Sequence, residues 1–239
     1  MRIFPVQRSD RQRGGIASIL VILVAVIVVA GGAAYWFLIR EDSKPKPKIE
    51  QTKTVAGGTV DGTWKLTAND ANGSFAQYRI KEQFAGGAIQ SEATGHTNDV
   101  TGSMKISGTT VSDITVTANL AVLKSDKDFR DGVLKERGLE TNKFPKATFT
   151  STAPITLASA PVKGTTINVP VTGDLTLHGV KKSVTVTLKG RWDGEKIQVV
   201  GELPIKLPDF GITPPTSPVV AEVDDHGTLE LKLFFTKTS

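Results

Sequence analysis

The side chains best suited to catalysis or metal binding are few and far apart in the sequence. The three histidines, His96, His178 and His226, are widely separated and do not form a metal-binding spacing such as H-E-x-x-H. His178 lies in a predicted hairpin turn and His226 in a second turn-like sequence, so we expect all three imidazoles at the surface. The chain has no cysteine, which excludes disulfide bonds, thiol catalysis and thiolate metal sites. The residues therefore predict no metal site.

Asp224 and Asp225 are the best candidates for a pair of catalytic carboxylates. Adjacent side chains on a strand point to opposite faces, so a pair of solvated turn residues is the simpler interpretation. The sequence has no G-x-S-x-G nucleophile motif, no phosphate-binding P-loop and no G-x-G-x-x-G opening a helix. We expect a protein that is not an enzyme and needs no cofactor, although a triad assembled in space from distant residues stays open.

The net charge of +5 comes from the N-terminal fifth of the chain rather than from the part expected to fold. The first 15 residues hold four arginines and one acidic residue, whereas residues 54–239 hold 20 Lys and Arg against 20 Asp and Glu. A neutral domain lacks the cationic excess that phosphate contacts require. Nucleic acid is therefore not an expected partner.

Residues 16–39 form a run of 24 residues without a charged side chain. As an α-helix the run would span roughly 36 Å, enough to cross a hydrocarbon core of ~30 Å. Tyr35 and Trp36 near its end suit the aromatic layer at a membrane interface. A cleaved signal peptide, cut among the small residues 30–34, is the alternative, but apolar residues continue beyond that point. We favour an uncleaved transmembrane helix.

This helix divides the chain into four predicted parts: a basic tail, a membrane helix, a Lys/Pro-rich tether and a folded domain, at residues 1–15, 16–39, 40–58 and 59–239. The alternating Lys and Pro of the tether predict a semi-stiff, solvated spacer. Lys and Arg are nearly balanced on the two flanks of the helix, so the positive-inside rule does not decide its orientation. Because a large domain usually follows an N-terminal anchor across the membrane, we expect a single-pass protein of the cell membrane with a cytoplasmic tail and an extracytoplasmic domain.

Beyond Trp64 the sequence alternates apolar and polar residues with a period of two. This pattern predicts strands that have one buried and one wet face, which is typical of antiparallel sheet. On one such strand Ile114, Val116 and Ala118 share a face. The pattern is clearest in four segments, residues 114–122, 184–192, 197–205 and 229–233.

Two hairpins of the same design occur in the domain. Residues 100–108 read V-T-G-S-M-K-I-S-G and residues 171–179 read V-T-G-D-L-T-L-H-G. Internal duplication and convergence on a favourable hairpin both explain the likeness. In either case Gly108 and Gly179 mark turns at which a positive φ is expected.

Residues 126–138 are the one convincing helix, because the segment begins with aspartates suited to capping and ends at Gly138. Seven to nine one-sided strands in a flat sheet would expose an apolar face and two edges, so we expect the sheet to close into a barrel or sandwich. The helix would cap one barrel mouth. Many of the predicted inward residues are small or β-branched, whereas Trp192 and Phe235 are large. This choice fits a cavity that holds one small ligand, and it fits a densely packed core equally well.

Several short motifs, in order along residues 62–237, resemble those of the YceI-like lipid- and polyisoprenoid-binding family. Residues 130–151 resemble its R-D…L…[KY]-[YF]-P-x-[AI]-x-F-x-S signature, and residues 171–180 resemble its G-x-L-T-[IL]-x-G-V hairpin. Residues 100–102 and 210–212 stand where the family has V-x-G and F-G-[IV]. The resemblance implies an all-β, lipocalin-like antiparallel barrel whose interior holds a polyprenyl, quinone or fatty-acyl lipid, in an extracytoplasmic setting.

The resemblance and the strand parity together give a set of expected ligand-binding residues on the barrel interior: Tyr78, Val116, Ala118, Leu120, Phe129, Leu175, Val186, Leu188, Trp192, Leu231 and Leu233. Many family members carry histidines where this chain has Val133 and the segment 78–82. Tyr78 or Arg79 is the candidate here to meet the polar head of a ligand, and a surface position is the alternative for both. The alternative function is an envelope interaction or structural module with a filled core and no lipid. The volume of the barrel interior distinguishes these two functions. The oligomeric state does not follow from the sequence.

Overall fold

The computed structural model describes residues 25–33, 43–84, 89–216 and 220–238, which fall into two compact units, residues 1–41 and 42–239. In the first unit residues 25–33 are helical, and their side chains are exposed. The predicted basic tail and most of the predicted membrane helix lie outside the described residues. Within the described ranges, no helix combines the length and the apolar character needed to span a membrane. The membrane anchor therefore stays a prediction.

The described part of the second unit consists of twelve strands, one α-helix and one 3₁₀ helix. In chain order these are β1 (Gly62–Leu66), β2 (Phe75–Phe84), β3 (Ile89–Thr97), β4 (Val100–Ser107), β5 (Thr110–Asn119), β6 (Lys124–Ser125), α2 (Asp128–Glu136), β7 (Lys146–Ser151), β8 (Ile155–Thr156), β9 (Thr166–Leu177), β10 (Val180–Trp192), β11 (Lys196–Lys206), η3 (Leu207–Phe210) and β12 (Val220–Lys237).

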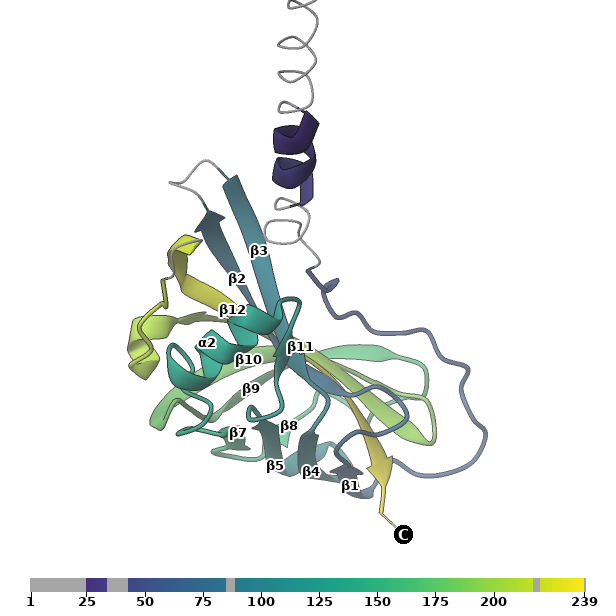
Figure 1. Cartoon of the computed structure of the whole chain (residues 1–239). Coiled ribbons are helices and arrows are strands. Elements are labelled where there is room, and N and C mark those ends of the chain that lie inside the picture. The colour runs from purple at the N-terminus through teal and green to yellow at the C-terminus, as the bar shows by residue number, and fades with distance from the viewer. Residues whose placement is uncertain (1–24, 34–42, 85–88, 217–219, 239) are drawn as a thin grey trace, which may run out of the picture. The chain divides into compact units, whose positions relative to one another are not determined.

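Eight of these strands form a closed antiparallel ring in the order β1-β4-β5-β7-β9-β10-β11-β12 (Figure 1). The ring closes where Trp64 and Lys65 of β1 pair with Lys237 and Thr236 of β12. The long β12 also pairs with β2, from which the sheet continues through β3 to β6, while β8 pairs with β5. Closure satisfies the strand edges that an open sheet would leave unpaired. The predicted all-β antiparallel barrel is confirmed for the described residues.

The barrel interior is formed by the faces that the alternation predicts. On β5, Ile114 and Ala118 are buried, and on β12 Leu233 and Phe235 are among the least exposed side chains of the core. The predicted face of residues 114–122 continues too far, because β5 ends at Asn119 and Val122 is exposed in the following turn. A period of two therefore identifies the inward face but not the residue at which a strand ends.

The two similar hairpins share a steric requirement. Gly108 and Gly179 have positive φ values of 57° and 75° at the hairpin turns, as expected. Gly102 and Gly173, the glycines of the two V-T-G sequences, lie against the neighbouring strand. A Cβ at either position would come closer than 3.0 Å to a backbone oxygen of that strand. The repeated glycine therefore permits close backbone approach at equivalent points of both hairpins.

The helix α2 is shorter than the predicted 126–138 by two residues at each end. Its N-cap is Lys127, whose side chain makes no capping hydrogen bond, so the expected capping by aspartate is wrong. Asp128 and Asp131 instead lie in the first turn, where negative charge is favourable at the positive end of the helix dipole. Arg130, Asp131 and Leu134 are the buried residues of this helix.

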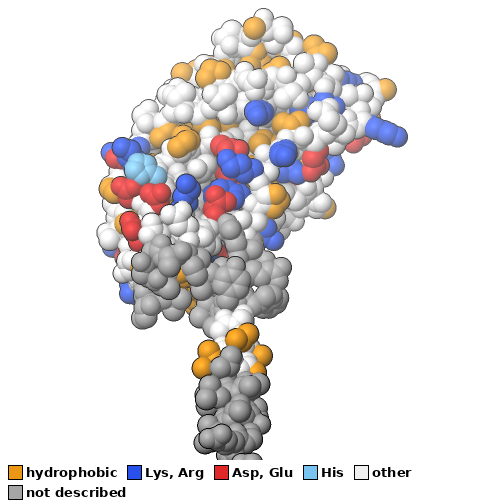
Figure 2. All heavy atoms as spheres, turned by 90° about the horizontal axis from the view of Figure 1, so that it is seen from above, with side chains coloured by type: hydrophobic (Ala, Val, Ile, Leu, Met, Phe, Trp, Pro, Cys, Tyr) orange, Lys and Arg blue, Asp and Glu red, His pale blue; other side chains and the backbone are white. Residues whose placement is uncertain are grey.

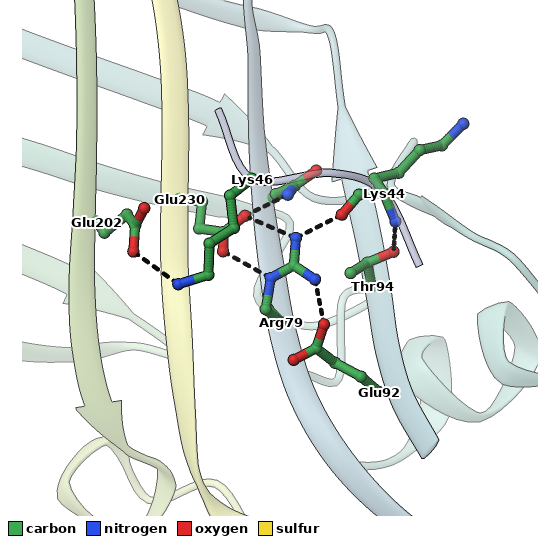
Figure 3. A network of polar contacts seen from close by, with 8 residues as sticks. Lys44, Lys46, Arg79, Glu92, Thr94, Glu202 and Glu230 are labelled. Carbon is green, nitrogen blue, oxygen red and sulfur yellow. Dashed lines mark hydrogen bonds and ion pairs between the residues drawn. The ribbon is translucent and has the colours of Figure 1, made fainter. Parts of the chain in front are cut away.

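Residues 43–58, here called the strap, have no regular secondary structure and lie against the barrel. The N–H of Lys44 donates to Thr94 Oγ1 (3.1 Å), and the guanidinium of Arg79 donates to the carbonyl of Lys44 (Figure 3). Further along, the N–H of Glu50 donates to Gln198 Oε1 (2.9 Å). The solvated spacer expected from the Lys/Pro composition is thus bonded to the barrel over this stretch.

A network of buried charges lies beneath the strap. Arg79 Nε donates to Glu230 Oε1 (2.7 Å), and Arg79 also donates to Glu92. Gln77 donates to the other oxygen of Glu230, whose side chain is fully buried. The hydrogen bond to Glu230 is the largest cause of a raised pKa for Arg79, so this side chain keeps its charge. The strap therefore lies over charged side chains of β2, β3 and β12 that are paired with one another.

On the barrel face in Figure 2, Lys and Arg side chains lie among Asp and Glu side chains rather than in one basic patch. Exposed pairs such as Lys46–Glu202 (3.0 Å) and Lys181–Asp174 (3.4 Å) follow the same arrangement. The balanced charge of residues 54–239 is therefore also mixed locally on this face.

Candidate functional site

A cavity of about 250 Å³ lies inside the barrel. Its wall comes from β2, β4, β5, β7, β9, β10, β11 and β12, and from α2, η3 and the residues that follow these helices. Most of the lining side chains are aliphatic or aromatic. The volume is close to the lower end of ligand pockets, which span roughly 300–1,000 Å³. The barrel interior is thus only partly filled by its own side chains.

Ten of the eleven predicted site residues are brought together on this cavity wall. They are Tyr78, Val116, Ala118, Leu120, Phe129, Leu175, Val186, Leu188, Leu231 and Leu233. Trp192 does not line the cavity. It is buried with Ile197 in the part of the core that side chains fill, and Lys163 Nζ lies 5.1 Å from the centre of its ring. The alternation of apolar and polar residues correctly predicted that Trp192 faces the interior. It does not predict which interior residues border the cavity.

Other lining residues were not in the predicted set. Val199, Leu203 and Ile205 of β11 belong to a face that the alternation had already identified. Phe149 of β7 contributes a large aromatic ring, and Leu207 and Ile212 come from η3 and the loop behind it. The 3₁₀ helix interrupts the period of two, so the alternation did not identify these last positions, although Ile212 belongs to the F-G-[IV] resemblance noted in the sequence.

One part of the wall is polar and is built by β2 and α2. Arg130 donates from Nε to Glu82 Oε1 (3.1 Å) and from Nη2 to Glu82 Oε2 (2.7 Å), and its Nη1 donates to Asp126. All three side chains expose less than a tenth of their surface. Burial opposes the charged form of Arg130, but the bonds and charge of Glu82 outweigh it and raise the pKa of this guanidinium. The cluster is therefore a permanent ion network that holds α2 on β2.

Tyr78 belongs to the cavity wall and lies near this network of charges. Its ring packs over Gly95 of β3, where a Cβ would come closer than 3.0 Å to the ring. The hydroxyl is buried and makes no hydrogen bond within the described part of the chain. Burial is the main reason why the pKa of Tyr78 is raised, although Arg130 acts in the opposite direction. The phenol is therefore protonated and available as a hydrogen-bond donor.

Comparison with known proteins identifies the domain that contains this cavity. The model of the YceI-like domain matches residues 51–235. The chain belongs to the YceI-like family. Protein YceI of Shigella flexneri is 36% identical to it over 118 residues, which are 46% of this chain and 58% of that protein. The matched region thus spans little more than half of the length of such curated relatives.

Two solved structures share the YceI-like fold with this chain. The structure of a polyisoprenoid binding domain from Saccharophagus degradans aligns with a TM-score of 0.57 and 17% identity, covering 73% of this chain and 98% of that one. Burkholderia cenocepacia BcnA aligns with a TM-score of 0.52 and 23% identity, covering 69% and 98%. At these identities the likeness establishes the barrel fold.

In this YceI-like domain both residues of the R-D pair, Arg130 and Asp131, hold α2 in place. Arg130 ties α2 to β2, as described above, and Asp131 ties it to β6. Asp131 Oδ1 accepts hydrogen bonds from the N–H and the hydroxyl of Ser125, both at 2.7 Å, and Lys124 Nζ lies 3.1 Å from Oδ2. Burial alone would raise the pKa of Asp131, but these bonds hold it below its ordinary value.

Either Tyr78 or Arg79 was expected to meet a ligand head, with a surface position as the alternative for each. The guanidinium of Arg79 is bonded to Glu230, Glu92 and the strap carbonyl of Lys44. These bonds leave Arg79 committed to protein partners, so Tyr78 stays the predicted contact for a ligand head. The sequence could not reveal the strap that satisfies Arg79.

The histidines of the YceI-like barrel differ in their surroundings. His178 is not a surface residue: its side chain is 9% exposed, Nε2 lies 2.7 Å from Glu140 Oε2, and Nδ1 lies 3.2 Å from the carbonyl oxygen of Phe210. His96 is half-buried, and burial lowers its pKa. His226 is exposed as expected, but it lies within β12 rather than in a turn.

Asp224, Asp225 and His226 lie at a bulge of β12, where the register against β2 shifts between Val223 and Gly227. The bulge brings one ligand atom of each of the three within 4.8 Å of the others. Adjacent carboxylates on a regular strand would diverge, so the expectation of opposite faces fails at the bulge. The cluster is largely exposed and lies outside the cavity wall, so it does not enter the candidate site.

Proposed function

We propose that the chain is a binding protein that holds one long isoprenoid or acyl lipid in the barrel cavity, for sequestration or transfer. The single observation that carries the proposal is the partly empty, largely apolar interior to which eight strands contribute. Each CH₂ group moved from water into such an interior contributes about 0.8 kcal/mol before ordering costs. A lipid chain therefore binds by burial alone, without a catalytic residue.

The comparisons support the same class of ligand. A structural neighbour is described as a polyisoprenoid binding domain, and the chain shares its fold. The alternative of an envelope module with a filled core is less well supported, because a cavity remains between the described side chains. We extend the proposal to location: residues 16–39 anchor the chain in the cell membrane, and the barrel works on the extracytoplasmic side, near the bilayer from which its lipid comes.

The proposal is tested by filling the cavity. Val116 and Leu231 line the wall from β5 and β12 and are only partly buried, so Val116→Phe with Leu231→Phe adds two rings inside the barrel. The probe is all-trans-retinol, an isoprenoid alcohol whose fluorescence rises in an apolar site, titrated into the full-length chain in a non-ionic detergent. We expect saturable binding to the wild type and an affinity at least about tenfold lower for the double variant, because the two added rings occupy the space that the ligand would fill.

The matched control is Val122→Phe, which adds a ring at an exposed position away from the cavity. It reports any change in detergent partitioning or solubility and is expected to bind retinol as the wild type does. Absence of saturable binding to the wild type would contradict the proposal, as would equal binding by the cavity-filled variant.

A further inference from the structure

The charged side chains of the cavity-lining residues are already paired. Arg130 is bonded to Glu82 and Asp126, and Arg79 is bonded to Glu230 and Glu92. An anionic ligand head would therefore have to compete with a carboxylate for an arginine, and a cationic head with an arginine for a carboxylate. Moving an unpaired charge into such surroundings is unfavourable.

The Tyr78 hydroxyl differs from these groups. Apart from Asp131 Oδ2, which is paired with Lys124 Nζ, four buried side-chain polar atoms lack a hydrogen-bond partner in the described part of the chain. Among these four, only the Tyr78 hydroxyl belongs to a residue of the cavity wall. Buried polar groups in native proteins are nearly always bonded, so an unbonded donor on a residue of the cavity wall points to a partner that arrives with the ligand.

The position of the phenol supports this assignment. Gly95, directly opposite Tyr78 in the β2–β3 pairing, leaves the space that the ring occupies. The nearest charged groups comprise Arg130 and three carboxylates, those of Glu82, Asp126 and Asp131. Since Arg130 is bonded to two of these carboxylates, the local surroundings favour a neutral acceptor over an anion.

We propose that Tyr78 donates a hydrogen bond to an uncharged oxygen of the bound lipid, so that the cavity selects chains with a carbonyl, ether or hydroxyl head over phosphate, carboxylate or amine heads. The inference rests on the proposed function, because it specifies the ligand of the same cavity. Tyr78 is then a specificity residue that acts on the head, while the apolar wall binds the chain.

The test uses four ligands that share one saturated isoprenoid skeleton: phytane, phytanyl methyl ether, phytanic acid and phytanylamine. Each displaces retinol from the full-length wild type and from Tyr78→Phe. In the wild type the ether is expected to bind about two- to tenfold more tightly than phytane, the range of one neutral hydrogen bond. The acid and the amine are expected to bind more weakly than the ether at neutral pH.

In Tyr78→Phe the advantage of the ether over phytane is expected to disappear, while the affinity for phytane stays unchanged. The control Thr172→Val removes an exposed hydroxyl that bonds to Thr185 outside the cavity, and it should keep the wild-type order of ligands. An unfolding temperature for Tyr78→Phe at or above that of the wild type shows that the fold is intact.

The outcomes separate the two proposals. If Tyr78→Phe keeps the preference for the ether, or if the acid or the amine binds the wild type as tightly as the ether, the role of Tyr78 is refuted and lipid binding stands. If neither retinol nor any of the four ligands binds the wild type, the proposed function itself fails.

Discussion

The buried pair of Arg130 and Glu82 offers a quantitative test of how α2 is held on the barrel. Replacing Arg130 by Met keeps a long side chain but removes the guanidinium that bonds Glu82 and Asp126. The two carboxylates expose only 6% and 8% of their side chains, so water cannot replace the lost partner without opening the site. The helix α2 should then detach more readily from β2.

The expected loss follows from the two unpaired charges. Removing one partner of a buried ion pair costs about 3–5 kcal/mol, a large share of a typical folding stability of about 5–15 kcal/mol. At about 2–4 °C per kcal/mol for a domain of this size, Arg130→Met lowers the unfolding temperature by about 6–20 °C. Glu82→Gln leaves Arg130 with Asp126 and an amide oxygen, so its cost is smaller, about 1–3 kcal/mol.

The assay is unfolding of the full-length chain, followed by the fluorescence of the buried Trp64 and Trp192. The double variant Arg130→Met with Glu82→Gln should be less destabilised than the sum of the single variants, with a coupling of about 0.5–3 kcal/mol. Lys181→Met, which removes an exposed pair, is the control and should cost at most about 1 kcal/mol. Additive effects of the two single variants, or a cost for Arg130→Met no larger than that of the control, would refute the assignment.

Three further predictions concern other parts of the fold. Because the folded-state pKa of Asp131 is lowered, its contribution to stability is present at neutral pH and is lost as the pH falls below about 4. The wild type should accordingly be more stable than Asp131→Asn at neutral pH and lose this advantage in acid-titrated thermal unfolding; an advantage that grows in acid would contradict the account. Arg79→Met leaves Glu230 buried without its cation and removes the donor to the strap, so we expect a loss of about 3–5 kcal/mol and faster hydrogen exchange of residues 44–50. Unchanged exchange there would show that Arg79 does not hold the strap. Gly102→Ala and Gly173→Ala should each destabilise by about 1–3 kcal/mol through contact with a strand backbone, whereas Gly190→Ala, whose nearest neighbour lies at 3.9 Å, should be tolerated in the same unfolding assay.

The barrel could be predicted because the pattern that identifies each strand lies within a short segment of the sequence. The alternation along residues 184–192 identifies which side chains face inward, and antiparallel pairing between neighbouring segments then requires closure of so large a sheet. The alternation also accounts for predicted wall residues that lie on strands, such as Val116, Val186 and Leu233. It does not account for Phe129, which lies on α2, or for Leu120, which follows the end of β5. It failed at Val122 and at the bulge of Asp224 and Asp225, where the strand ends or its register shifts.

The rest depends on contacts between residues distant in sequence. The partners of Arg79 come from β3, β12 and the strap, and those of His178 come from the loop at Glu140 and from Phe210. No pattern within a window of the sequence connects these positions. Trp192 illustrates the same limit, because whether an inward side chain fills the core or borders a cavity depends on the sizes of all its neighbours.

The central claim is that a lipid occupies the barrel, and native mass spectrometry of the full-length chain purified from the cells that make it tests this most directly. We predict one bound species per chain whose mass matches an uncharged isoprenoid or acyl lipid, and its absence from the variant with Val116→Phe and Leu231→Phe. A wild-type chain that carries no lipid in any preparation, or a cavity-filled variant that carries the same species, would contradict the account.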